Sequence, residues 1–123
     1  MATAARLFTQ TFKDVTIVNF EEARILDTAL IQKIGEELYR LVDDMARRKL
    51  VLDFTKVQFL SSSALGVLIT LQKKATAAKA TVVICGMRKE LMKVFEIMKI
   101  DKLFKFCADE RAGLAVFGVT SEG

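Results

Sequence analysis

LVLDFTKVQFLSSSALGVLITLQKKA, residues 50–75, is the stretch of the chain that decides its fold. It overlaps the run KLVLDF, residues 49–54, whose leucine and β-branched side chains are typical of a buried strand. The segment FLSSSALGV, residues 59–67, follows this strand and holds three of the four serines of the chain. Small and apolar residues then recur at every third or fourth position, which predicts a helix with a narrow buried face: Ala64, Leu68, Leu71, Ala75 and Ala78.

The residues before this stretch predict a hairpin and one helix. RLFTQTF, residues 6–12, and VTIVNF, residues 15–20, are β-rich runs separated by the turn-like dipeptide KD. After a connector at 21–27, a helix is expected to begin near Asp27 or Thr28, either of which can cap it. The apolar residues of this helix lie on one face: Leu30, Ile34, Leu38, Leu41 and Met45.

The residues after this stretch predict two more strands and two more helices. ATVVICG, residues 80–86, is typical of a buried strand, and KLFKFC, residues 102–107, of a short final strand. RKELMKVFEIMK, residues 88–99, predicts a helix, and DERAGLAVFG, residues 109–118, a last helix that Asp109 caps. The helix at 88–99 is expected to bury four residues: Leu91, Val94, Phe95 and Met98.

The element order β-β-α-β-α-β-α-β-α predicts a single α/β domain over residues 1–123, with a mixed sheet packed against helices. Strands that are joined through a helix are expected to lie parallel, with right-handed crossovers. The hairpin supplies the antiparallel part of the sheet. The core of this domain is expected to span about 7–117.

Composition disfavours several classes of partner. The net charge of +4 is mild and no run of five basic residues occurs, so nucleic acid is not expected as a partner. No stretch approaches the ~18–20 apolar residues of a membrane span. The first twelve residues lack the apolar core of a signal peptide, which favours a cytoplasmic protein without a membrane partner. Cys85 and Cys107 are expected to be buried free thiols, with no metal bound.

Catalysis is a poor use for the three serines. A serine nucleophile needs a base, the chain has no histidine, and Lys73 lies too far along the same helix to serve Ser63. Phosphate-cradling glycine motifs are also missing, so neither an enzyme nor a cofactor is expected. Helix capping explains one serine, because only one residue can occupy the cap. A hydroxyl at an exposed loop–helix junction suits a phosphate acceptor better.

The same stretch resembles the core motif of the STAS domain, as found in bacterial anti-sigma factor antagonists. In that family a strand ends in Asp and is followed by D-S-S/T-G-L-G and a helix. Asp53 matches the strand Asp, Ser62 and Ser63 match the S-S/T pair, and Leu65 and Gly66 match directly. Ser61 stands where the family usually has Asp, and Ala64 replaces Gly. The resemblance continues through residues 80–104, which end in the DKLF phrase, and covers 7–117.

The resemblance implies a phospho-switch. In the family, an unphosphorylated antagonist binds an anti-sigma factor that is itself a serine kinase, and thereby releases a sigma factor. Phosphorylation abolishes this binding and a phosphatase restores it. By position, Ser63 is the implied phosphate acceptor, with its neighbour Ser62 as the helix cap. The resemblance also leaves a homodimer open. The partner-binding surface is expected at the start of the helix and comprises six residues: Ser61, Ser62, Ser63, Ala64, Gly66 and Val67.

Three alternatives to the antagonist remain at this point. STAS domains also serve as non-catalytic scaffold or regulatory subunits of stress-signalling complexes, in which case the protein would assemble into a large particle. Some STAS-like domains are ligand-binding modules for nucleotides or apolar molecules. An enzyme is disfavoured for want of catalytic groups. Met87 and Met92 do not fit the buried face of their helix, so they belong either to peripheral core or to a docking surface.

Overall fold

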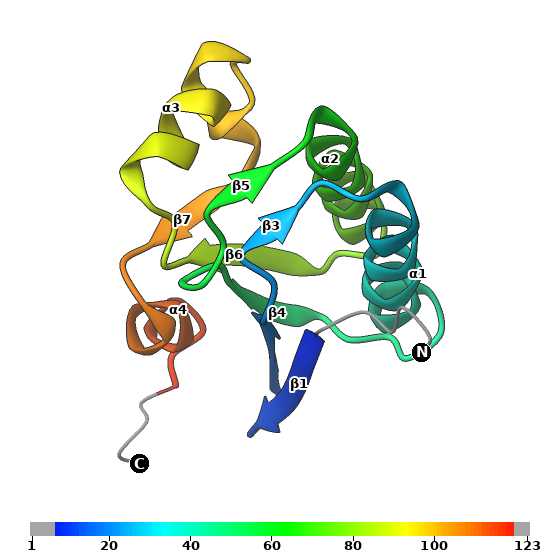
Figure 1. The fold of residues 1–123 in the computed structure, drawn as a ribbon. Helices are drawn as coiled ribbons and strands as arrows, with labels where there is room; N and C mark the ends of the chain where they lie inside the picture. The colour runs from blue at the N-terminus through cyan, green and yellow to red at the C-terminus, as the bar shows by residue number, and fades with distance from the viewer. Residues whose placement is uncertain (1–6, 120–123) are drawn as a thin grey trace.

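A five-stranded sheet of order β1-β2-β4-β6-β7 forms the centre of the computed structural model, which describes residues 7–119 (Figure 1). The strands are β1 (Leu7–Phe12), β2 (Val15–Phe20), β4 (Lys49–Asp53), β6 (Thr81–Cys85) and β7 (Lys105–Cys107). Two short strands, β3 (Arg24–Ile25) and β5 (Phe59–Leu60), pair separately. The helices are α1 (Thr28–Asp43), α2 (Ser62–Ala77), α3 (Lys89–Ile97), the 3-10 helix η1 (Asp101–Leu103) and α4 (Glu110–Val116).

The sheet is mixed, as the sequence predicts. β1 and β2 form an antiparallel hairpin, in which Phe12 lies opposite Val15 across a two-residue turn. Lys13 in this turn has a φ of 57°, which lets the strands fold back on each other. All other neighbouring strands of the main sheet are parallel, and helices connect β2 to β4, β4 to β6 and β6 to β7.

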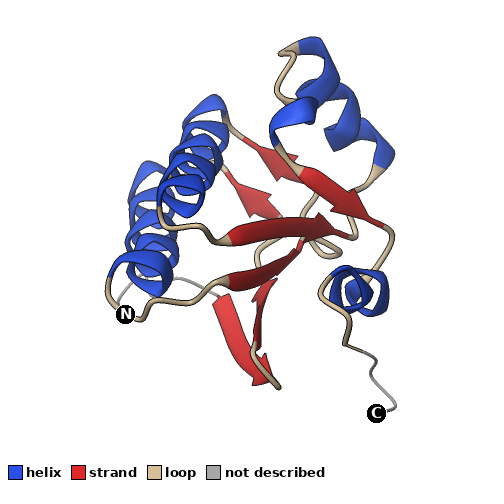
Figure 2. Cartoon of the chain, turned by 180° about the vertical axis from the view of Figure 1, so that it is seen from behind, coloured by secondary structure: helices blue, strands red, loops and turns tan. Residues whose placement is uncertain are grey.

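Helices cover the two faces of the sheet unequally (Figure 2). α1, α2 and α3 share one large hydrophobic cluster with strand residues such as Phe20, Leu52 and Ile84. α4 covers the other face through a smaller cluster, in which Leu114 packs with Val51 and Cys85. Because β4 and β6 lie between both clusters, their residues 50–52 and 82–85 are all apolar and buried.

The starts of α1 and α4 lie where the sequence predicts them, with Asp27 or Thr28 as the candidate cap of α1 and Asp109 as that of α4. Asp27 caps α1 by accepting a hydrogen bond of 2.9 Å from the Leu30 N–H. Asp109 caps α4 in the same way, with the Ala112 N–H as donor at 2.9 Å. Both caps satisfy backbone groups that the first turn of a helix leaves without an intrahelical partner. Within residues 7–119, no helix is both long and apolar enough to cross a membrane.

Two predicted buried faces need correction. Met45 follows the end of α1 and is 47% exposed, while Ile31 and Val42 are buried in its place. Val94 in α3 and Met98 directly after it are exposed, and only Leu91 and Phe95 of α3 are buried. The reason is that α3 lies at the margin of the sheet, where a single stripe along the helix reaches the core. Phe95 occupies that stripe and contacts the rings of two neighbours, Phe104 and Phe106.

The last predicted strand is shorter than expected, because residues 101–103 form η1 and only Lys105–Cys107 is extended. Both cysteines are free thiols; Cys85 is buried, whereas Cys107 is half-buried. Burial raises the pKa of Cys85 to about 12, so this thiol stays protonated at neutral pH. Met87 is half-buried and packs against the main core, while Met92 is half-buried on α3.

A polar cluster ties α4 to the sheet. The Asn19 side-chain amide donates hydrogen bonds to Asp53 and to Glu110. Burial disfavours the charged form of Asp53, but hydrogen bonds from Glu110, Thr55 and Asn19 outweigh it and lower the pKa of Asp53. The hydrogen bond with Asp53 and burial together raise the pKa of Glu110. Asp53 therefore ionises first, and Glu110 holds the proton between the two carboxyl groups.

We predict that Glu110→Gln raises the melting temperature at pH 7 and that this gain vanishes near pH 4. Because the pKa of Glu110 is raised in the folded protein, protonated Glu110 contributes to stability at low pH. This stability is lost as pH rises through the folded pKa and the side chain ionises. Above that pH both carboxylates are charged and repel each other, whereas glutamine stays neutral. The gain should stay below about 1 kcal/mol, because Glu110 is only partly buried and solvent screens the pair.

Melting curves at pH 4 and pH 7 measure this effect. Glu36→Gln makes the same charge change at an exposed position of α1 and serves as the control. A gain at pH 7 that Glu36→Gln reproduces, or one that persists unchanged at pH 4, would contradict the proton-sharing pair.

Candidate functional site

Ser61 caps the helix that carries the serine triplet. Its backbone is extended, with φ −84° and ψ 168°, and its hydroxyl accepts a hydrogen bond from the Ala64 N–H at 3.2 Å. The expectation that Ser62 caps this helix is therefore wrong, because Ser62 is already the first helical residue. Asp is as good a capping residue as Ser. Ser61 can thus hold the helix start at the position where the resemblance has Asp.

A small parallel ladder holds the serines in place. β3 and β5 pair Arg24 with Phe59 and Ile25 with Leu60. The Ile25 carbonyl then accepts a hydrogen bond from the Ser61 N–H at 3.1 Å. This bond holds Ser61 in the extended backbone that a capping residue needs. The sequence predicted neither strand, since each has only two residues and shows no periodicity.

The hydroxyl groups of Ser62 and Ser63 differ from that of Ser61, which is hydrogen-bonded in the helix cap. Both are exposed in the first turn of α2, and neither hydroxyl makes a hydrogen bond to any other part of residues 7–119. The first turn of a helix also has N–H groups without intrahelical partners, and the positive end of the helix dipole lies there. An added phosphate would meet a favourable electrostatic environment at this helix start.

The remaining residues of the expected surface differ in exposure. Ala64 is buried, and Val67 is half-buried against α1, where its methyl groups lie 3.5 and 3.6 Å from the position that a Gly35 Cβ would occupy. Their part in partner binding stays a prediction, and the structure gives both a packing role. Gly66 is exposed, and a Cβ built on it would have no described atom within 4 Å beyond its chain neighbours and the backbone of its own helix. The fold has no packing reason for glycine at this position.

Two exposed apolar residues lie close to the serines along the β3–β5 ladder. Leu26 follows β3 and is 41% exposed, and Phe59 in β5 is 47% exposed. The Arg24 guanidinium lies over the Phe59 ring, 5.0 Å from its centroid. The sequence analysis missed these residues, because their exposure follows from the β3–β5 pairing and not from a local pattern. They give this corner an apolar and basic surface beside two free hydroxyls.

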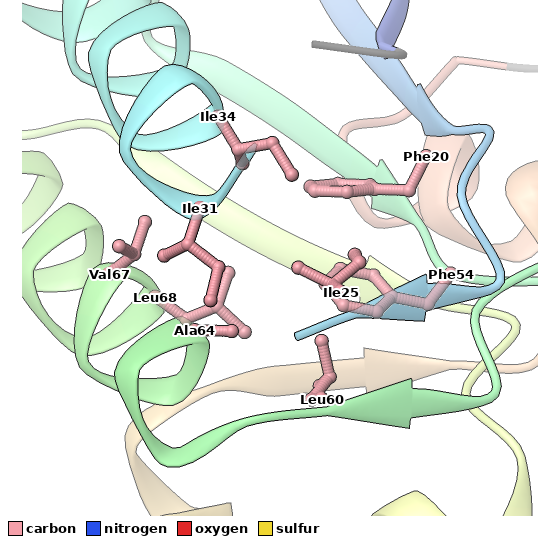
Figure 3. A pocket seen from close by; sticks show the side chains of 9 residues that line it. All are labelled: Phe20, Ile25, Ile31, Ile34, Phe54, Leu60, Ala64, Val67 and Leu68. Atoms are coloured by element: carbon pink, nitrogen blue, oxygen red, sulfur yellow. The ribbon is translucent and has the colours of Figure 1, made fainter. Parts of the chain in front are cut away.

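A small apolar cavity lies beneath the serine-bearing turn (Figure 3). It measures about 10 Å³, which is close to the least room that one water molecule needs. Apolar side chains from α1, α2 and the β3–β5 ladder, and from the carboxyl ends of β2 and β4, point into it: Phe20, Ile25, Ile31, Ile34, Phe54, Leu60, Ala64, Val67 and Leu68. The cavity therefore offers neither the volume nor the polar groups that a nucleotide would need.

Comparison with known proteins gives a family. The model of the STAS domain family matches residues 7–113. By sequence, the chain is similar to BtrV of Bordetella bronchiseptica, a candidate anti-sigma factor antagonist by its name. The two are 26% identical over 93 residues, which cover 76% of this chain and 79% of that protein.

Two solved structures show the same fold. An anti-sigma-factor antagonist (STAS) domain protein from Planctomyces limnophilus superposes with a TM-score of 0.79 at 20% identity, covering 93% of this chain and 98% of that chain. The Bacillus cell fate determinant SpoIIAA in its phosphorylated form superposes with a TM-score of 0.70 at 14% identity, covering 89% and 98%. At these identities the two structures show a shared fold.

We predict that Ser61→Ala destabilises the protein by about 1 kcal/mol, whereas Ser62→Ala leaves stability nearly unchanged. The first substitution removes the oxygen that accepts from the Ala64 N–H, and the second removes a hydroxyl without a partner in the described chain. Urea unfolding of the two variants measures the difference. Equal losses for both variants would contradict the assignment of Ser61 as the cap.

We also predict that Gly66→Ala stabilises the protein by up to about 1 kcal/mol, because alanine favours the helix and fills open space. Gly113→Ala is the matched control in another helix. Its Cβ would lie 3.0 Å from a Val51 methyl, so this variant should be destabilised. Urea unfolding of both variants checks the pair, and a loss of stability for Gly66→Ala would show that the fold itself needs this glycine.

Proposed function

Because this chain belongs to the STAS domain family, we propose that it is an anti-sigma factor antagonist switched by phosphorylation of Ser63. When Ser63 is unphosphorylated, the protein binds an anti-sigma factor that is also a serine kinase, and a sigma factor is released. Phosphate on Ser63 ends this binding, and a phosphatase restores it. The observation that carries the proposal is the exposed, unbonded hydroxyl of Ser63 in the first turn of α2.

The three serines differ in their fitness as acceptors. The Ser61 hydroxyl is committed to the helix cap and half-buried, so a kinase would have to break the helix start to reach it. Ser62 and Ser63 are both exposed. Ser63 is favoured because it occupies the acceptor position of the motif that the chain resembles. Ser62 provides a natural control, because it is also exposed but does not occupy the acceptor position.

Phosphate on Ser63 should act on the docking surface and leave the fold intact. At a helix start, the phosphate meets free N–H groups and the positive end of the dipole, so α2 does not unfold. The same group brings about −1.5 to −2 charges to a surface that presents Leu26 and Phe59 to a partner. Desolvating this charge in an apolar interface is costly, and each ~1.4 kcal/mol lowers affinity tenfold. A few kcal/mol would suffice for on/off control.

We predict that incubation with ATP and lysate of the native organism adds one phosphate to the wild-type chain and to Ser62→Ala, but none to Ser63→Ala. Intact mass and phosphopeptide mapping measure the site. The kinase found in this way should bind Ser63→Ala stably and bind Ser63→Asp at least about tenfold more weakly. Thr70→Asp, which places the same charge at an exposed position further along α2, should bind normally.

Two results would contradict the proposal. One is phosphate that persists in Ser63→Ala, which would move the acceptor to another residue. The other is an unmodified triplet in a lysate whose kinases phosphorylate a control peptide. A large particle in size-exclusion chromatography, together with an unmodified triplet, would favour the scaffold subunit of a stress-signalling complex.

A further inference from the structure

β1 (Leu7–Phe12) forms one edge of the main sheet, and its outer side pairs with no other strand of residues 7–119 (Figure 1). The edge strand at the other end, β7, has only three residues and carries the exposed Lys105, and both features discourage pairing with another chain. β1 has six residues and contains no charged residue, glycine or proline. The sheet is therefore protected at one edge and open at the other.

The hairpin geometry decides which backbone groups of β1 point outward. A two-residue turn is closed by a pair whose N–H and C=O groups both face the partner strand, here Phe12 and Val15. Orientation alternates along a strand, so Gln10 and Phe8 also bond to β2. The N–H and C=O groups of Thr9 and Thr11 then face the open edge. These are the groups that an additional strand would pair with.

Five of the six residues of β1 form a sequence that reads the same in both directions. Residues 8–12 are FTQTF, a palindrome centred on Gln10. In an antiparallel pair of two such strands, Gln10 lies opposite Gln10 of the second copy, and Thr9 lies opposite Thr11. This register matches the backbone orientation above, because it places the outward-facing threonines in hydrogen-bonded pairs. Two-fold symmetry repeats each contact, so the edge is complementary to itself.

The side chains suit the same register. Phe8 is 57% exposed and Phe12 is half-buried, and both lie on the face of the sheet that α4 partly covers. In the paired strands, Phe8 would face Phe12 of the second copy in a non-hydrogen-bonded pair, where side chains are closest. Thr9 and Thr11 are exposed on the opposite face and would form threonine pairs. Aromatic and threonine pairs are both stabilising across antiparallel strands.

We infer that β1 is a homodimerisation edge, at which two copies of this chain pair antiparallel about a two-fold axis through Gln10. The two sheets become one continuous sheet, and the dimer is closed because pairing consumes both open edges. The start of α2 lies away from β1 (Figure 1), so each copy keeps its serines accessible. This inference does not depend on the phosphorylation of Ser63.

Sedimentation velocity of the full chain tests the dimer, over roughly 10 µM to 1 mM because a single strand pair is a small interface. The wild-type chain should approach twice its mass of 13.7 kDa. Gln10→Lys and Gln10→Glu each place like charges opposite each other and should be monomers over the same range. Mixing the two variants should restore a dimer. Gln32→Lys and Gln32→Glu, at an exposed position of α1, should dimerise like the wild type.

A cysteine pair tests the register in a Cys107→Ser background. Gln10→Cys should form an intermolecular disulfide on mild oxidation, because the non-hydrogen-bonded pair brings the Cα atoms to about 4.5 Å. Thr11→Cys should not, because its opposite residue is Thr9. Cross-linking through residue 11 in place of residue 10, a monomeric wild type at all concentrations, or open-ended aggregates would overturn the inference.

Discussion

The burial of β4 on both faces is the constraint on which the rest of this structure depends. Leu50, Val51 and Leu52 are completely inaccessible to solvent, with β2 and β6 on either side. Because both neighbours run parallel to β4, the chain must return through a helix before and after it. Those helices are α1 and α2, and they pack on the same face. The chain leaving β4 therefore reaches the carboxyl edge of the sheet, where polar residues and the serine triplet gather.

At this edge the three serines divide two tasks. Ser61 is bonded at both its backbone and its side chain, to Ile25 and to Ala64, so it fixes where α2 begins. Ser62 and Ser63 follow at exposed positions and are not needed for that purpose. A phosphate on Ser63 can consequently change the affinity for a partner without changing the folded structure. A switch with this division loses affinity on phosphorylation while the free energy of unfolding stays nearly constant.

The two surfaces proposed for contact occupy different parts of the molecule and have different chemistry. The start of α2 presents hydroxyl groups beside Leu26 and Phe59, which suits a partner that must distinguish a hydroxyl from a phosphate. The edge of β1 presents backbone donors and acceptors, which suit another strand. A dimer formed at β1 would carry two copies of the α2 surface. A partner with two matching sites would then bind with increased avidity.

The sequence by itself determined the features that depend on neighbours in the chain. The order of the five main-sheet strands and the four α-helices and the cap Asp109 follow from local patterns that the structure reproduces. For α1 the sequence offered Asp27 or Thr28 as the cap, and the structure has Asp27. The choice of cap within the triplet was decided by the tertiary structure, because only Ser61 is held extended by Ile25 from a distant strand. The exposure of Val94 and of Phe59 was decided in the same way. Periodicity places residues on a common face, but which part of that face is covered depends on elements far away in the sequence.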